Sequence, residues 1–365
     1  MHILQITPRY IPNIGGVETV VQKISETLVA RGIQVTIYSV DLSPNLLRTE
    51  NIRGVLVKRF IPVLGDPLYL PEPRFITALR REKADLIHVH NIHILPPLLV
   101  ASFKRRNQKL LLQPHYHRFG QSSLRHSLLR LYRQVVNNVV FPRTNLVVAN
   151  SQYERKILCK DFSKCANLVL IPEGVDVDEV KNVKRNPSEP KRILYVGALK
   201  GYKNVDKLLK GFAWLTRNEK TAFRLVIIGN GSEHDSLISL ANDLGISSLV
   251  EWKHDLPREQ LLSEYAEASI FVLLSQLESF SRVVYDALLI GVPTVVLSFG
   301  PLEDLVKSGL AEGVDSFDPK EIGDALTRAT KRTYARISAT SQDFLYWKEY
   351  SNRIIRAYHN LLEKK

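Results

Sequence analysis

The sequence predicts an α/β protein with two domains, each built around a mostly parallel sheet, and three observations lead to this fold class. Short apolar runs alternate with stretches of helical apolar spacing, a pattern typical of parallel strands joined by helices that cover both faces of a sheet. The pattern occurs twice, before and after a polar segment with two prolines at residues 181–191. The length of 365 residues also exceeds what one hydrophobic core usually supports.

Each half of the chain supplies a series of candidate strands. Those expected in the first half are 2–7, 35–40, 55–60, 86–90, 110–113, 146–150 and 168–172, with helices at about 17–31 and 75–81. Those expected in the second half are 193–196, 225–228, 249–252, 270–274 and 294–297. We interpret residues 181–191 as the linker between the domains, because they are polar and lack apolar periodicity.

The end of the chain predicts an amphipathic helix. Its apolar positions are Trp347, Tyr350, Ile354, Ala357, Tyr358 and Leu361. Their spacing marks one face of a helix, and we expect that face to pack on another part of the protein.

The charge of the chain favours an anionic ligand or partner. Fifty Lys and Arg residues against 37 Asp and Glu residues give a formal charge of +13. Nucleic acid, a nucleotide substrate and an anionic membrane surface all fit this charge. The basic residues are scattered over both halves, and no zinc-finger, RNA-recognition or basic-zipper pattern is present. We therefore do not expect nucleic-acid binding.

The sequence predicts a cytoplasmic protein, with attachment to the inner face of the membrane as an alternative. No apolar run approaches the length of a membrane span, about 20 residues. The first residues, MHILQITPRY, read as a strand and lack the features of a signal peptide. The two cysteines, Cys159 and Cys165, are too few for a disulfide framework.

Residues 275–296, SQLESFSRVVYDALLIGVPTVV, combine a strand end, a short loop and a helix. Glu278 lies in the loop and Asp286 on the predicted helix. A loop that leads from a strand into a helix suits phosphate, because free backbone N–H groups and the helix dipole point there. Carboxylates suit sugar hydroxyls, since an ionised carboxylate accepts the hydrogen bonds that hydroxyls donate. The segment is therefore a candidate ligand site.

Two further loops follow predicted strands. Gly15 and Gly16 precede a helix, where paired glycines permit positive φ and a close approach of the backbone to a diphosphate; a simple turn is the alternative. Lys200 and Lys203 follow the strand at 193–196, where cations can neutralise phosphate oxygens. Solvated surface lysines are the alternative there.

Five histidines within thirty residues raise the question of zinc: His88, His90, His93, His115 and His117. No Glu-flanked His pair at helical spacing is present and neither cysteine is near in sequence, so we expect no metal. One histidine acting on a substrate is the better functional interpretation, with structural roles as the alternative. The triplet Asp-Val-Asp at 176–178 fits either a divalent ion at a diphosphate or a helix start.

A basic amphipathic helix is predicted from Ser122 to Val136, SSLRHSLLRLYRQVV. Its leucines share one face, and arginines surround them. Such a helix can dock on an anionic membrane or simply cover a sheet, and both interpretations stay open.

Taken in this order, the stretches resemble retaining glycosyltransferases of the GT-B fold, the large family that includes sucrose synthases and bacterial mannosyltransferases (glycosyl transferases group 1). The similar stretches are GGVE at 15–18, IPEGVD at 171–176, VGALKGYKNVDKLLKGF at 196–212, IGNGSE at 228–233, LESFSRVVYDALLIGVPTVV at 277–296 and YWKEY at 346–350. The resemblance implies two Rossmann-like domains facing across a cleft, with a C-terminal helix that crosses back to the N-terminal domain.

The resemblance also implies domain boundaries. Residues 1–172 would form the acceptor-side domain and 173–345 the nucleotide-sugar donor domain. Residues 346–365 would form the helix that packs back on the first domain.

Carried over residue by residue, the resemblance implies roles at one site. Glu278 would contact the transferred sugar, and His115 would lie close to the reacting sugar, with His117 as a rival. Asp286 would bind the ribose hydroxyls. The full set implied in donor binding is Gly15, Gly16, Lys200, Lys203, Phe280, Ser281, Arg282 and Asp286.

The chain departs from the family pattern at four of its motif positions, one of which is Glu173, where the family usually has an asparagine before the Gly-Val-Asp turn. Ala198 stands where the family usually has an arginine, so Lys200 or Arg282 would have to supply that charge. Ser281 replaces a glycine, and Asp286 replaces a glutamate.

We therefore predict transfer of a sugar from a UDP- or GDP-sugar to an acceptor hydroxyl, with retention and without a metal or cofactor. A sugar or a lipid-linked molecule would be the acceptor, as in glycolipid, glycan or polysaccharide assembly. The alternatives are an epimerase or phosphorylase on the same fold, and a non-catalytic protein that binds sugar nucleotides or membranes.

Overall fold

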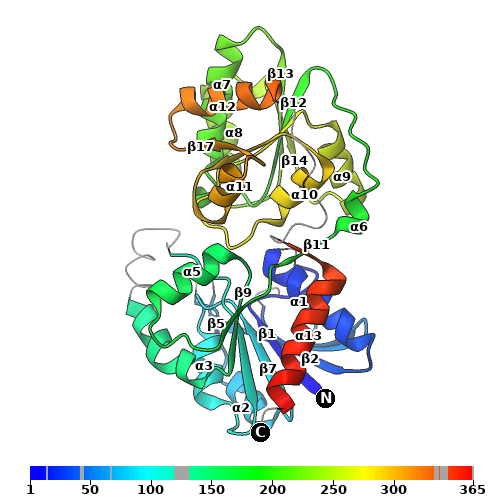
Figure 1. Cartoon of the computed structure of the whole chain (residues 1–365), viewed down its shortest axis with the longest axis vertical. Helices are drawn as coiled ribbons and strands as arrows, with labels where there is room; N and C mark the ends of the chain where they lie inside the picture. The colour runs from blue at the N-terminus through cyan, green and yellow to red at the C-terminus, as the bar shows by residue number, and fades with distance from the viewer. Residues whose placement is uncertain are drawn as a thin grey trace. The chain divides into compact units, whose positions relative to one another are not determined.

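The structure is a computed structural model of the chain and describes residues 1–13, 15–41, 45–65, 68–118, 131–332, 337 and 344–363 (Figure 1). The chain divides into two compact units. Unit 1 comprises Met1–Gly174 with Gln342–Lys365, and unit 2 comprises Val175–Ser341. Within the described ranges, no helix is both long and apolar enough to cross a membrane.

The described part of unit 1 contains an eight-stranded sheet in the order β10-β9-β8-β7-β1-β2-β4-β3. β3 runs antiparallel to β4, and the other neighbouring strands are parallel. Parallel neighbours require crossover connections, which agrees with the alternation in the sequence. The strands are β1 (His2–Thr7), β2 (Gln34–Val40), β3 (Thr49–Ile52), β4 (Val55–Phe60), β7 (Leu86–His90), β8 (Lys109–Gln113), β9 (Leu146–Ala149) and β10 (Leu168–Leu170).

Helices cover both faces of this sheet (Figure 1). Adjacent residues of β1 point to opposite faces: Ile3 lies in the core formed with α1 and α13, whereas Leu4 lies in the core formed with α2, α3 and α5. Burial on both faces explains why these strands read as nearly continuous apolar runs. The helices are α1 (Gly16–Val29), α2 (Arg74–Arg81), α3 (Pro96–Phe103), α5 (Gln152–Asp161) and α13 (Trp347–Glu363).

The C-terminal helix α13 packs on α1 within unit 1. Trp347, Tyr350, Ile354 and Tyr358 are buried in the same core as Ile24 of α1. The prediction that the last helix returns to the N-terminal domain is confirmed, and the predicted apolar face is the one that packs.

In the described part of unit 2, six parallel strands form a sheet in the order β14-β13-β12-β15-β16-β17. The strands are β12 (Lys191–Val196), β13 (Phe223–Ile228), β14 (Val250–Lys253), β15 (Ile270–Leu273), β16 (Thr294–Leu297) and β17 (Glu312–Val314). The helices that matter below are α6 (Val177–Val180), α7 (Val205–Asn218), α9 (Arg258–Glu267), α10 (Arg282–Ile290) and α12 (Pro319–Lys331). The predicted mixed α/β class with parallel sheets is confirmed in both units.

Residues 181–191, predicted as the linker, lie inside unit 2 in this division. Arg185 donates from Nη2 to the Ala268 carbonyl at 2.8 Å, and the Asn186 amide donates to the Ala266 carbonyl at 2.9 Å. Lys191 is already the first residue of β12. These hydrogen bonds hold the polar segment on the end of α9.

Candidate functional site

The sheet of unit 2 has its topological switch point between β12 and β15. From β12 the chain proceeds outward through β13 and β14, and then returns to place β15 on the other side of β12. In open parallel sheets, the crevice outside the carboxyl ends of the strands at such a point is the usual ligand site. The loops that follow β12 and β15 carry Lys203 and Glu278.

Asn204 joins these two loops. Its Nδ2 donates to the Leu274 carbonyl at 2.7 Å, and the Gln276 amide donates to the Tyr202 carbonyl at 3.0 Å. Asn204 has φ 56° and ψ 37°, a left-handed conformation that asparagine tolerates better than most residues. This buried residue was not predicted from the sequence, and an Asn directly before a helix start was the available signal.

Lys203 and Glu278 form an ion pair, with Nζ and Oε1 2.5 Å apart. Their side chains are only 14% and 12% exposed. Burial alone would lower the pKa of Lys203, but the attraction of Glu278 and Tyr202 and the hydrogen bond to Glu278 leave its pKa above the ordinary value. A charged ammonium and a carboxylate therefore lie together at the switch point, where one suits phosphate and the other suits a hydroxyl.

The amino end of α10 lies in the same loop region. Ser281 is its N-cap residue, with φ 85° and ψ 74°, and no side-chain hydrogen bond caps the helix. The Ser281 hydroxyl oxygen is buried without a hydrogen-bond partner among the described residues. Phe280 is 3% exposed and stacks on Tyr285 with ring centroids 4.4 Å apart. The first-turn N–H groups of α10 are of the kind that bind anions.

Arg258 binds the carboxylate of Asp286 through two hydrogen bonds. Nη1 donates to Oδ2 at 2.6 Å and Nη2 to Oδ1 at 3.0 Å, while Nε donates to Glu179 at 2.9 Å. Burial alone would lower the pKa of Arg258, but the two carboxylates raise it overall, so the guanidinium stays charged. The sequence analysis missed this partner of Asp286. Each Asp286 oxygen keeps a lone pair for a further donor.

Lys200 and Arg282 border the same loops. Lys200 is the residue before the short helix η3 (Gly201–Lys203), and Arg282 is the first residue of α10. Both side chains are partly buried.

Gly15 and Gly16 in unit 1 do not use the positive φ that was expected of them. Gly15 has φ −179°, which is extended backbone, and Gly16 is the first residue of α1. A Cβ on Gly16 would meet no atom within 4 Å. Open space at a helix start is compatible with a ligand approaching the backbone, so that part of the interpretation stays a prediction.

His115 lies after the carboxyl end of β8. It is 8% exposed, has φ 47°, and its Nδ1 lies 3.0 Å from Asn150 Nδ2. His117 is less buried, stacks on His93 with ring centroids 4.0 Å apart, and its amide lies 3.1 Å from His93 Nε2. The two candidates thus occupy different surroundings, and the catalytic role of His115 stays a prediction.

Glu154 supports the loop that carries His115. Its two carboxylate oxygens accept hydrogen bonds of 2.6 Å from the amides of Tyr116 and Asn150. Complete burial raises the pKa of Glu154 to about 8, against these two donors that favour the charged form. The sequence contains a signal for this arrangement that was not used in the prediction, because Ser151 and Glu154 have the spacing of a capping box. In the structure, Ser151 Oγ accepts a hydrogen bond from the Glu154 amide.

The remaining histidines are structural in their contacts. His88 Nδ1 lies 2.7 Å from the Tyr358 hydroxyl and His90 Nε2 lies 3.0 Å from Gln5 Oε1. Within the described ranges, no group of three or more His, Cys, Asp or Glu side chains is placed to hold a metal ion. Asp178 of the Asp-Val-Asp triplet lies in α6 and pairs with Lys181 at 2.6 Å.

Most of the predicted helix from Ser122 to Val136 lies outside the described residues. At its described end, Tyr132 donates to the Ile94 carbonyl at 2.7 Å, and Val136 is buried. That end therefore packs within unit 1.

Comparison with known families gives two matches along the chain. Residues 176–342 match the family described as Glycosyl transferases group 1, and residues 14–179 match Glycosyltransferase Family 4. The chain is of the GT-B glycosyltransferase type, and its second half matches group 1. The two matches meet near the boundary between the units, so the glycosyltransferase pattern runs through both.

Curated relatives of this glycosyltransferase include D-inositol 3-phosphate glycosyltransferases. The protein from Corynebacterium jeikeium is 32% identical over 53% of this chain and 51% of its own length. That from Catenulispora acidiphila is 24% identical over 96% of this chain and 91% of its own length. Mannosylfructose-phosphate synthase from Agrobacterium fabrum is 26% identical over 55% of this chain. The chain thus spans about half the length of several of these relatives.

Solved structures share the fold over the whole chain. Sucrose-phosphate synthase from Thermosynechococcus elongatus has a TM-score of 0.78 at 18% identity and covers 100% of both chains. Anabaena HepE, solved with UDP and glucose, has a TM-score of 0.75 at 18% identity over 99% of this chain and 100% of its own. The predicted GT-B fold is confirmed by these likenesses.

Proposed function

We propose that this glycosyltransferase moves a sugar from a UDP- or GDP-sugar to an acceptor hydroxyl, with retention and without a metal ion. The observation that supports it is the buried Lys203–Glu278 pair at the switch point of unit 2. Relatives support the substrate class: HepE was solved with UDP and glucose, and a trehalose-phosphate synthase from Burkholderia xenovorans with glucose-6-phosphate. The acceptor is a sugar, a sugar phosphate or a lipid-linked sugar.

In the proposed reaction, the acceptor oxygen bonds to the anomeric carbon on the face from which the diphosphate oxygen leaves. The acceptor hydroxyl gives its proton to the leaving phosphate oxygen. Negative charge grows on the diphosphate, and Lys203, with Lys200 and the first N–H groups of α10 around Phe280 to Arg282, stabilises it. Glu278 orients the transferred sugar, and Asp286 binds the ribose. The resemblance implies two further contacts, one from the backbone at Gly15 and Gly16 to the donor diphosphate and one from His115 to the sugar, and both stay predictions.

The direct test incubates the purified protein with a panel of UDP- and GDP-sugars and acceptor mixtures and measures nucleotide release. One donor should release UDP or GDP in an acceptor-dependent way, with unchanged rate in the presence of a chelator. The product anomer, read by NMR, should match the donor. An inverted anomer, or a rate abolished by the chelator, contradicts the corresponding part of the proposal.

Lys203→Ala and Glu278→Ala should each lower kcat/KM by about 100-fold or more, because each removes a group that acts on the departing or transferred part of the donor. Each change also leaves the other charge buried without its partner, so we expect a loss of unfolding free energy of about 3 kcal/mol. Lys210→Ala, on α7, is the matched control and should change neither quantity. Wild-type kcat/KM in either variant would contradict the assigned roles.

A non-catalytic sugar-nucleotide-binding protein is the second candidate, because Ala198 provides no cation at the motif position where the family usually has arginine. Its signature would be tight binding of UDP or GDP in calorimetry with no nucleotide release from any donor. An epimerase would instead convert the donor sugar without releasing nucleotide.

A further inference from the structure

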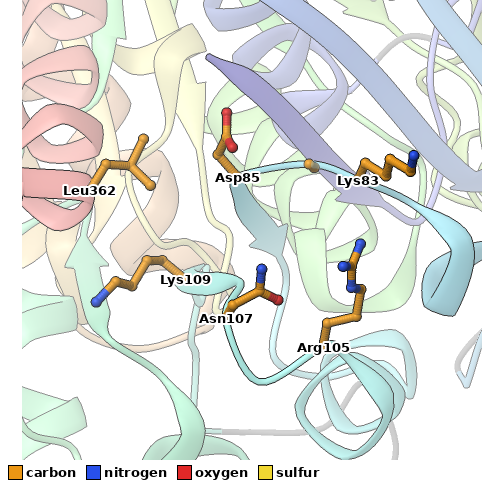
Figure 2. A pocket seen from close by; sticks show the side chains of 7 residues that line it. Lys83, Asp85, Arg105, Asn107, Lys109 and Leu362 are labelled. Carbon is orange, nitrogen blue, oxygen red and sulfur yellow. The ribbon is translucent and has the colours of Figure 1, made fainter. Parts of the chain in front are cut away.

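A basic cavity of about 310 Å³ lies at the amino-terminal edge of the sheet in unit 1. Figure 2 shows Lys83 and Arg105 on one side of Asn107, and Lys109 and Leu362 on the other. These groups come from the turn before β7, the turn before β8 and the end of α13. Three cationic side chains and a single carboxylate, Asp85, line the cavity.

This cavity is separate from the predicted sugar site. It lies next to the first residues of β7 and β8, whereas His115 follows the last residue of β8. A five-residue strand such as β8 spans about 17 Å. No residue assigned to the donor or acceptor sugar lines it.

Gln108 holds the two turns of the cavity at a fixed spacing. Its side chain is 2% exposed, and Nε2 donates to the carbonyls of Glu82 and Ala84 at 3.0 and 3.1 Å. Its Oε1 accepts from the Arg105 amide at 3.0 Å. The two turns that contain Lys83 and Arg105 are thus held in place by a buried polar side chain. A ligand that binds between them would therefore need to order little of the backbone.

Two of these cations, Lys83 and Arg105, are exposed at the cavity. Asp85 already accepts a hydrogen bond of 2.8 Å from the His2 amide. Over the described part of the chain, no carboxylate pairs with the side chain of Lys83 or Arg105, and the neighbouring Arg81 and Arg106 are also exposed. Burial, and after it the charge of Lys109, lower the pKa of Lys104, whose Nζ donates to the Gln108 carbonyl at 2.7 Å. A bound anion would relieve this repulsion.

We propose that this cavity binds a phosphate group, carried either by a soluble phosphate compound or by a lipid headgroup. The guanidinium of Arg105 and the ammonium of Lys83 are the donors that phosphate oxygens prefer, and the Asn107 amide adds neutral donors. Leu362 supplies one apolar wall.

The test measures binding of pyrophosphate by calorimetry in the Lys203→Ala background, so that the proposed donor site does not contribute. Pyrophosphate should bind, and K83E/R105E should weaken it at least about tenfold, the factor for losing one charge-assisted hydrogen bond. Gln108→Ala should also weaken it while keeping every charge. R155E/K156E, on the exposed face of α5, makes the same change in net charge and should leave binding unchanged.

A second arm sediments the protein with vesicles of phosphatidylcholine, with and without phosphatidylglycerol. Vesicle binding that needs phosphatidylglycerol and is lost in K83E/R105E identifies a lipid headgroup, and pyrophosphate binding alone identifies a soluble phosphate. Binding to neither probe, or equal loss in R155E/K156E, overturns the proposal. Because the readout is binding at a site distinct from Lys203, this outcome is independent of whether sugar transfer is found.

Discussion

Ser281 is a residue whose backbone conformation favours glycine. Its φ of 85° lies in the left-handed region, and its hydroxyl oxygen is buried without a hydrogen-bond partner among the described residues. Ser281→Gly should raise the unfolding free energy by about 0.5–1 kcal/mol, because relief of backbone strain outweighs the added entropy of the unfolded chain. Urea denaturation measures the change. A destabilised variant would mean that the hydroxyl contributes more than the strain removes.

Substitution of Arg258 should change the stability of the protein, because this residue pairs with a buried carboxylate. Arg258→Ala leaves Asp286, whose side chain is 8% exposed, without its partner and should lower the unfolding free energy by about 3 kcal/mol. Arg258→Lys should recover only part of it, because lysine cannot make the two parallel hydrogen bonds. Glu179→Gln is the control: that pair is exposed, so its loss should change stability by at most about 0.5 kcal/mol.

The same substitution tests whether Arg258 positions Asp286 for the donor. If Asp286 binds the ribose as proposed, Arg258→Ala should raise KM for the nucleotide sugar more than it lowers kcat. An unchanged KM in a folded variant would separate the structural role of the pair from any role in donor binding.

At the scale of elements, the close contact of α7 and α12 depends on a glycine. A Cβ added at Gly323 of α12 would lie 2.3 Å from Cε3 of Trp214 on α7. The rigid indole ring would have to move to relieve this clash, which is harder than moving the end of a flexible side chain. Gly323→Ala should therefore lower the unfolding free energy by about 1–2 kcal/mol, in spite of the better helix propensity of alanine. Gly201→Ala is the matched control, since a Cβ there meets nothing within 4 Å. Equal stability of the two variants would contradict the packing argument.

At the scale of the whole molecule, stability should fall in mild acid because unit 1 holds histidines neutral. Burial lowers the pKa of His88 to about 3 and also lowers those of His90 and His93. Below about pH 6.5 these histidines bind protons in the unfolded chain but stay neutral in the folded chain. Each of them therefore lowers the unfolding free energy by about 1.4 kcal/mol for every pH unit of acidification. Glu154 acts in the opposite sense, since its folded pKa of about 8 makes the folded state gain stability as pH falls.

Three histidines against one glutamate give a net loss of unfolding free energy between about pH 6.5 and 5. Urea denaturation across this range measures it. Glu154→Gln removes the opposing contribution, so its stability should fall more steeply with pH than that of the wild type. A flat wild-type profile would mean that the buried histidines are protonated without unfolding.

The sequence predicted the elements well because each leaves a local trace. Apolar runs marked strands that are buried on both faces, and the apolar face of the last helix appeared as a repeat from Trp347 to Leu361. Lys203 and Glu278 were predicted as site residues because each follows a strand in a recognisable motif, and the structure pairs their side chains. The prediction of a positive φ at Gly15 was wrong, because a glycine permits several conformations and its neighbours decide which one it adopts.

By itself, therefore, the sequence determined the fold class, the family and the two loops that form the candidate site in unit 2. Only the tertiary structure showed that Asn204 joins those loops, that Arg258 binds Asp286 and that Gln108 fixes the basic cavity. Their partners lie 70, 28 and 26 residues away along the chain. Secondary structure depends on the spacing of neighbouring residues, which a sequence displays directly. Contacts between distant residues depend on the strand order and register, which local spacing does not encode.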